Sequence, residues 1–162
     1  MVKNLIRRRS ELLVREIDLN LENNSDEKIE KILVCITAQS NSVRLIDRAA
    51  KVADENNGEL HILHVLRGNN VFNNSETLAL LQRLFMYGGG KGGMIHAFCN
   101  DDVCKSISDF VLEENITKVV LGEPPSENVK KSKKHTESFF DKIVKSLPKS
   151  AQIIIVEKED KH

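Results

Sequence analysis

The sequence predicts a three-layer α/β/α sandwich built on a five-stranded, mostly parallel sheet. Short apolar, β-branched runs alternate five times with segments of helical periodicity along the 162 residues. The clearest unit spans residues 31–65, where a strand, an amphipathic helix and a second strand follow one another. Two strands joined by a single helix must run parallel, so this unit predicts a βαβ crossover.

Within this unit, residues 32–36 are apolar and predict a strand buried on both faces. Residues 37–41 form a small polar loop, and Ser40, Asn41 or Ser42 can cap the helix that follows. Gly58 is expected to end that helix in the left-handed conformation, before a second strand over residues 60–65.

The remaining elements follow by the same patterns. Helices are expected over residues 75–87 and 139–147, and Pro148 ends the second of these. A further helix is expected to begin after a cap at Asp101 or Asp102. Strands are expected over residues 94–98, 119–121 and 152–156. Residues 88–93 read GGGKGG, but they follow a helix and precede a strand, whereas a phosphate-binding loop does the reverse. We therefore expect a flexible connection there.

Composition excludes several classes of protein. Lys and Arg together number 24 and so do Asp and Glu, so charge gives no indication of a nucleic-acid partner. No apolar stretch approaches the roughly 20 residues of a membrane span, and no signal peptide is evident. The expected location is cytoplasmic, with the three cysteines as reduced thiols; a metal or redox pair of Cys99 and Cys104 is the less favoured alternative.

The chain divides into an N-terminal helical extension, residues 1–25, and one domain, residues 26–162. The extension begins with a basic cluster, Arg7 to Arg9. A solvated helix face is the favoured interpretation of this cluster, and an anionic surface the alternative.

The candidate binding site follows from the predicted sheet. Ligands of parallel sheets bind outside the carboxyl ends of the strands, which here selects residues 37–42, 64–68 and 122–138. Helix N-termini offer amides to anions there, and a lysine run adds positive charge unless it is only a solvated loop. The candidate ligand-binding residues are Thr37, Ala38, Gln39, Ser40, Ser42, His64, Gly122, Lys130, Lys131, Lys133 and Ser138.

Catalytic constellations are missing from the sequence. His61 and His64 lie three apart on a strand, so they face opposite sides of the sheet and cannot chelate one metal ion. There is no Gly-x-Ser-x-Gly turn and no His-Glu-x-x-His pair. We expect no catalytic residues and no metal site, and hence a non-enzymatic protein.

Two segments, KILVCITAQSNSVRLIDRAAKVADENNGELHILHV and NITKVVLGE, resemble the universal stress protein family. The closer resemblance is to the stress-protein-like domain of KdpD-type osmosensing histidine kinases, whose preceding Arg/Leu/Glu-rich helix is similar to NLIRRRSELLVREIDLNLE. The resemblance implies a sheet of strand order 3-2-1-4-5 and a homodimer formed through Gln152–Val156. Whether the chain is a stand-alone relative or an excised piece is left open.

The resemblance also bears on nucleotides. ATP-binding members have an Asp after the first strand and a glycine pattern after the fourth; here Thr37 replaces the Asp, Gly122 matches the first glycine and Pro125 replaces the second. Some KdpD-type domains instead bind cyclic di-AMP through a Ser-x-Ser loop, which Ser40-Asn41-Ser42 matches. The cofactors that the resemblance suggests are therefore cyclic di-AMP or ATP.

Three functions are consistent with these observations. The first is a non-enzymatic sensor or regulatory domain linked to potassium or osmotic signalling, gated by a small nucleotide and acting on a kinase or transporter partner. The second is an ATP-binding stress protein with slow hydrolysis. The third is a pure protein-interaction module that acts through the N-terminal helix and the dimer edge.

Overall fold

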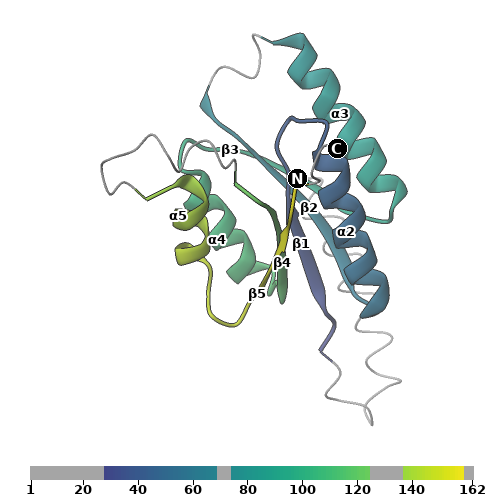
Figure 1. The fold of residues 1–162 in the computed structure, drawn as a ribbon, viewed down its shortest axis with the longest axis vertical. Helices are drawn as coiled ribbons and strands as arrows, with labels where there is room; N and C mark the ends of the chain where they lie inside the picture. Colours follow the sequence, from purple (N-terminus) through teal and green to yellow (C-terminus); the bar gives the residue numbers. More distant parts are fainter. Residues whose placement is uncertain (1–27, 69–73, 125–136, 159–162) are drawn as a thin grey trace.

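The computed structural model describes residues 28–68, 74–124 and 137–158, and these form a three-layer α/β/α sandwich (Figure 1). The strands are β1 (Lys31–Cys35), β2 (Glu59–Leu66), β3 (Met94–Cys99), β4 (Lys118–Gly122) and β5 (Gln152–Val156). The helices are α2 (Ser42–Glu55), α3 (Ser75–Gly90), α4 (Val103–Glu113) and α5 (Phe139–Ser146).

The sheet has the order β3-β2-β1-β4-β5, and all four pairings are parallel. This confirms the predicted fold class and strand order. The central strand β1 pairs with β2 on one side and with β4 on the other, so the chain that leaves β1 and the chain that leaves β4 emerge side by side. Such a reversal of strand order is where ligands of open α/β sheets bind.

Side-chain alternation along the strands builds a core on each face of the sheet. Ile32 and Val34 of β1 pack toward α2 and α3, whereas Leu33 packs toward α4 and α5. Figure 1 shows the two helix pairs on opposite sides of the sheet. No helix among the described residues is long and apolar enough to cross a membrane.

Two glycine predictions were wrong in detail. The left-handed residue after α2 is Asn57, with φ of 49°, and not Gly58. Gly58 is required for a different reason: a Cβ there would lie 2.5 Å from the carbonyl oxygen of Glu30. The close approach of this turn to the start of β1 therefore excludes any side chain.

The glycine-rich stretch is not a flexible connection throughout. Gly88 to Gly90 form the last turn of α3, and Gly88 is buried. A Cβ on Gly88 would lie 2.1 Å from Cδ1 of Ile62, and one on Gly93 2.6 Å from the same atom. These glycines let the end of α3 and the chain into β3 approach β2 closely, which is a packing role that the spacing alone did not reveal.

The N-terminal extension, residues 1–25, lies outside the described residues, as do the loop that carries Lys130, Lys131 and Lys133 and the chain end that follows residue 158. The predicted cap of the third helix is confirmed at Asp102, whose side chain accepts a hydrogen bond from the amide of Lys105 at 3.0 Å.

Candidate functional site

A cavity of about 750 Å³ opens at the carboxyl ends of β1, β2 and β4. The first turns of α2, α4 and α5 complete its wall. Its floor is apolar and includes Leu63, Ile107, Leu121 and Ile143, while polar side chains surround the opening. An apolar floor with a few polar groups at the rim is typical of small-molecule sites of this size.

Five of the predicted site residues line this cavity: Thr37, Gln39, His64, Gly122 and Ser138. The expected proximity of the β1–α2 loop and the Gly122 turn is therefore confirmed. Ala38, Ser40 and Ser42 are not among the cavity-lining residues. The lysines of the 123–136 loop lie outside the described residues, so their part in the site stays a prediction.

Ser42 holds the β1–α2 loop together from inside. Its side chain is fully buried. The hydroxyl accepts a hydrogen bond from the amide of Thr37 at 3.3 Å and donates one to the carbonyl of Thr37 at 2.7 Å. Of the three residues predicted as the helix cap, Asn41 occupies the N-cap position, but its side chain makes no capping hydrogen bond. Ser42 thus shapes the loop, and a contact of its hydroxyl with a ligand is not supported.

The first amides of α2 are also engaged. Those of Ser42, Val43 and Arg44 donate to the carbonyls of residues 39, 40 and 41 at 3.0, 3.4 and 3.1 Å. The expectation that this helix N-terminus offers its amides to an anion is therefore wrong for these three groups. Each of these amides bonds the carbonyl three residues earlier, in the loop that precedes α2, and is therefore already satisfied.

His64 is held in one orientation at the cavity wall. Its Nδ1 lies 2.7 Å from the carbonyl oxygen of Ile36. A carbonyl only accepts, so Nδ1 carries the hydrogen and, in the neutral ring, Nε2 is the acceptor. His64, which was predicted from its place near the end of the strand, is thus oriented at the cavity wall by a hydrogen bond to the chain that leaves β1.

Arg67 and Phe139 form a contact at the rim that sequence reasoning missed. The guanidinium carbon of Arg67 lies 4.9 Å from the centre of the Phe139 ring, within the range of a cation–π interaction. Both residues line the cavity, and Phe139 is 45% exposed. The sequence analysis placed Phe139 at the start of a predicted helix and did not select it for the site. Arg67 lay in the selected stretch 64–68, from which only His64 was chosen.

Opposite charges balance around the opening. Arg67 and Lys158 line the cavity, and so do Glu123 and Asp141. The amide of Lys158 donates to a carboxylate oxygen of Glu123 at 2.9 Å, which orders the chain after β5. The candidate residues chosen from the sequence did not include this segment, so its contribution to the wall was not predicted.

Two cysteines near the cavity are protonated thiols. Burial raises the pKa of Cys35, which lines the cavity, to about 12. Burial, followed by the nearby Asp102, also raises the pKa of Cys104. Within the part of the chain that the structure describes, no group of three His, Cys, Asp or Glu side chains could hold a metal ion. The apolar floor and polar rim of the cavity suit binding of a small molecule.

Comparisons with known proteins agree with this fold. Residues 28–88 match the model of the universal stress protein family. A putative sensor protein KdpD from Synechocystis is 32% identical over 121 residues, which cover 70% of this chain and 32% of that protein. The sensor protein KdpD of Mycobacterium tuberculosis is 31% identical over 96 residues, which cover 59% of this chain and 11% of that protein. The chain thus spans a third or less of these relatives.

Solved structures share the architecture at low sequence identity. A universal stress protein from Archaeoglobus fulgidus has a TM-score of 0.58 at 17% identity and covers 78% of this chain and 92% of its own. A universal stress protein in complex with cAMP has a TM-score of 0.56 at 14% identity, and the match covers 80% of this chain and 98% of that protein's chain. An Archaeoglobus fulgidus universal stress protein in complex with dAMP has a TM-score of 0.53 at 13% identity, and the match covers 79% of this chain and 97% of that protein's chain.

Proposed function

Because the chain contains a domain of the universal stress protein family that resembles KdpD sensor proteins, we propose that it is a non-enzymatic sensor or regulatory domain gated by a small nucleotide. The observation that carries this proposal is the cavity at the carboxyl ends of β1, β2 and β4. Potassium or osmotic signalling and a kinase or transporter partner follow from the resemblance to KdpD and belong to the proposal.

The cavity fits a nucleotide in three respects. Its floor offers apolar area to a base, and its volume of about 750 Å³ can hold a mononucleotide or larger. Thr37, Gln39 and His64 offer hydrogen-bonding groups, and Arg67 offers a cation. Two solved relatives of the same fold are complexes with cAMP and dAMP, which supports a ligand of this class.

The charge around the rim bears on which nucleotide binds. A triphosphate needs an excess of cations or a metal ion, and here Glu123 and Asp141 offset Arg67 and Lys158. Three amides at the start of α2 are already engaged. We therefore expect cyclic di-AMP, with two phosphate charges, to bind more tightly than ATP.

Equilibrium dialysis of the full chain against ATP and against cyclic di-AMP tests the proposal. We expect cyclic di-AMP to be retained, and the Arg67→Ala variant to weaken its binding by about tenfold through loss of one charge-assisted contact. Thr117→Val, at the opposite end of the sheet, is the matched control and should bind as wild type does.

Tight retention of ATP with release of phosphate would favour the alternative, a stress protein with slow hydrolysis. Retention of neither nucleotide would overturn the gating proposal and favour a pure interaction module.

The β5 edge supports a homodimer as the partner arrangement. β5 pairs only with β4 among the described strands, and Ile155 on it is 49% exposed. A strand edge with an exposed apolar side chain is a natural surface for pairing with a second copy. Size-exclusion chromatography with light scattering should give a dimer for wild type and a monomer for Ile155→Lys, and a wild-type monomer would contradict this arrangement.

A further inference from the structure

Arg67 and Phe139 join two elements across the rim of the large cavity. Arg67 directly follows β2, and Phe139 is the first residue of α5. The guanidinium carbon of Arg67 lies 4.9 Å from the centre of the Phe139 ring, and both residues line the cavity. Because Phe139 is exposed, core packing alone does not account for the place of its ring.

The backbone fixes both ends of this contact. The amide of Asn100 donates to the carbonyl of Leu66, the last residue of β2, at 2.9 Å, which holds the chain just before the arginine. Ser138 caps α5 immediately before Phe139, because its hydroxyl accepts a hydrogen bond from the amide of Asp141 at 3.1 Å. The ring therefore belongs to a first helical turn that is already ordered.

Two carboxylates line the same cavity, and other groups already occupy them. An oxygen of Asp141 accepts from the Ser138 hydroxyl at 2.8 Å. An oxygen of Glu123 accepts from the amide of Lys158 at 2.9 Å. Among the residues that the structure describes, Arg67 makes no ion pair and no hydrogen bond, and its side chain contacts the aromatic ring instead.

A ring and a carboxylate support an arginine in different ways. A carboxylate would hold the guanidinium but would also neutralise its charge and occupy its N–H donors. The face of an aromatic ring attracts the cation through the ring quadrupole and leaves those donors for another acceptor. Arg67 is thus restrained at the rim while its charge and its donors stay available to an anion.

We propose that Phe139 is a positioning residue whose ring holds the Arg67 guanidinium at the rim, where the guanidinium binds a phosphate of the nucleotide. This role rests on the proposed function, because it concerns the same site. A planar guanidinium matches the oxygens of a phosphate in a bidentate arrangement, so its orientation matters for affinity. The competing role for Phe139 is direct stacking with the base, which would not depend on Arg67.

A double-mutant cycle separates these two roles. The measurement is equilibrium dialysis of the full chain against whichever of cyclic di-AMP and ATP wild type retains more tightly. Phe139→Leu keeps an apolar side chain and removes the ring, and we expect it to weaken binding about fourfold, the strength of an exposed cation–π contact. In the Arg67→Ala background the same substitution should change the affinity by less than about 1.5-fold. Phe139→Tyr restores a ring and should bind within about twofold of wild type.

The outcomes distinguish this role from the proposed function. An equal loss of affinity in both backgrounds would show that the ring contacts the base, and unchanged binding by Phe139→Leu would show that the ring does not matter. Either result would overturn the positioning role and leave the nucleotide site standing. Retention of neither nucleotide by wild type would overturn the proposed function, and the positioning role with it.

Nuclear Overhauser contacts in wild type decide the matter if a variant does not fold. We expect contacts between the δ-methylene protons of Arg67 and the ring protons of Phe139 in the ligand-free chain, and the same contacts after the nucleotide binds. Their absence from the ligand-free chain, or their loss on binding because the base replaces the cation on the ring, would overturn the proposal.

Discussion

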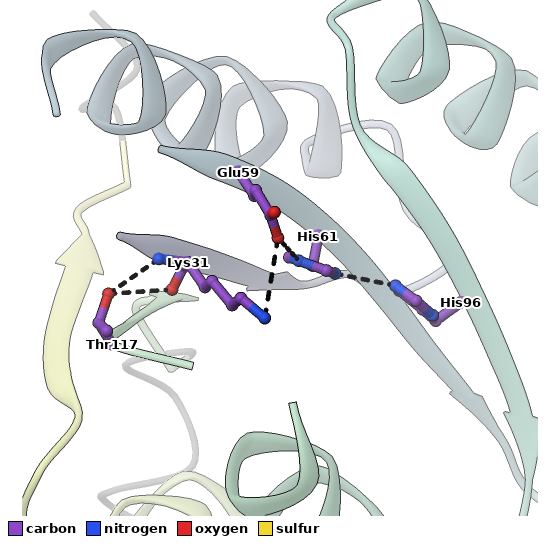
Figure 2. Close-up of polar contacts among 5 residues, drawn as sticks. All are labelled: Lys31, Glu59, His61, His96 and Thr117. Atoms are coloured by element: carbon purple, nitrogen blue, oxygen red, sulfur yellow. Dashed lines mark hydrogen bonds and ion pairs between the residues drawn. The ribbon is translucent and has the colours of Figure 1, made fainter. Parts of the chain in front are cut away.

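The two ends of the sheet use their polar residues in different ways. At the amino end, the Thr117 hydroxyl donates to the Glu30 carboxylate and accepts from the amide of Lys31 at 3.0 Å, and Lys118 lies 3.2 Å from the same Glu30 oxygen. Figure 2 shows the bonds of Thr117 to the backbone of Lys31. At the carboxyl end, polar side chains instead surround a cavity of about 750 Å³.

This difference separates stability from binding. Groups that bond one another at the amino end lower the free energy of the folded state and leave little for a ligand. Groups that line the cavity, such as Thr37 and His64, keep hydrogen-bonding capacity for a molecule that enters it. We therefore expect substitutions at the amino end to change stability, and most substitutions at the carboxyl end to change ligand binding.

The largest contrast is expected between two glycines. A Cβ on Gly58, at the amino end, would lie 2.5 Å from a backbone oxygen, whereas one on Gly122, at the carboxyl end, would approach nothing closer than 3.4 Å. Gly58→Ala should lower the free energy of unfolding by about 3 kcal/mol, and Gly122→Ala should change it by less than about 0.5 kcal/mol. Urea denaturation of both variants measures this, and equal costs would contradict the contrast.

Thr117→Val should have the next largest effect. The substitution keeps the shape of the side chain but leaves the amide of Lys31 and the carboxylate of Glu30 without the hydroxyl. We expect a loss of about 2 kcal/mol in the free energy of unfolding, with nucleotide affinity unchanged. A weakened affinity in the folded variant would show that the two ends are not independent.

Ser138 is the exception that sharpens the comparison, because it lines the cavity and also caps α5. Its hydroxyl accepts a hydrogen bond from the amide of Asp141 at 3.1 Å. Ser138→Ala should cost about 1 kcal/mol, and Ser138→Thr, whose hydroxyl can still accept from this amide and donate to the Asp141 carboxylate, should recover most of it. Thermal unfolding of the two variants checks this; equal midpoints would mean that the cap contributes nothing.

The smallest expected effect is a pH dependence at the amino end. The hydrogen bond from Thr117, then that from Lys118, lowers the pKa of Glu30 below its ordinary value of 4.5. A lowered folded-state pKa means that this stabilisation is present above pH 4.5 and is lost as the pH falls through the folded-state pKa. Glu30→Gln should therefore lose less stability than wild type does between pH 6 and 3, as followed by urea midpoints.

The sequence predicted the fold well because the signals for it are local and periodic. The apolar run of β1 and the alternation of strands with amphipathic helices determine the layers. The resemblance added the strand order. The role of Gly88 was not predictable, because its cause is the side chain of Ile62 on another element.

The site was predicted at the level of segments and less well at the level of side chains. Strand direction was enough to bring Thr37 and Gly122 together. The burial of Ser42 and the contact of Arg67 with Phe139 depend on how loops fold back and how helices begin. No sequence period encodes those arrangements, and the lysine run remains outside the described residues.

The most direct test of the central claim is a titration of the ¹⁵N-labelled full chain with cyclic di-AMP, followed by NMR. We predict shift changes at the amides of Thr37, His64 and Gly122, which line the cavity, and none at Lys31 or Thr117. Shift changes confined to the amino end, or no changes at saturating nucleotide, would contradict the account.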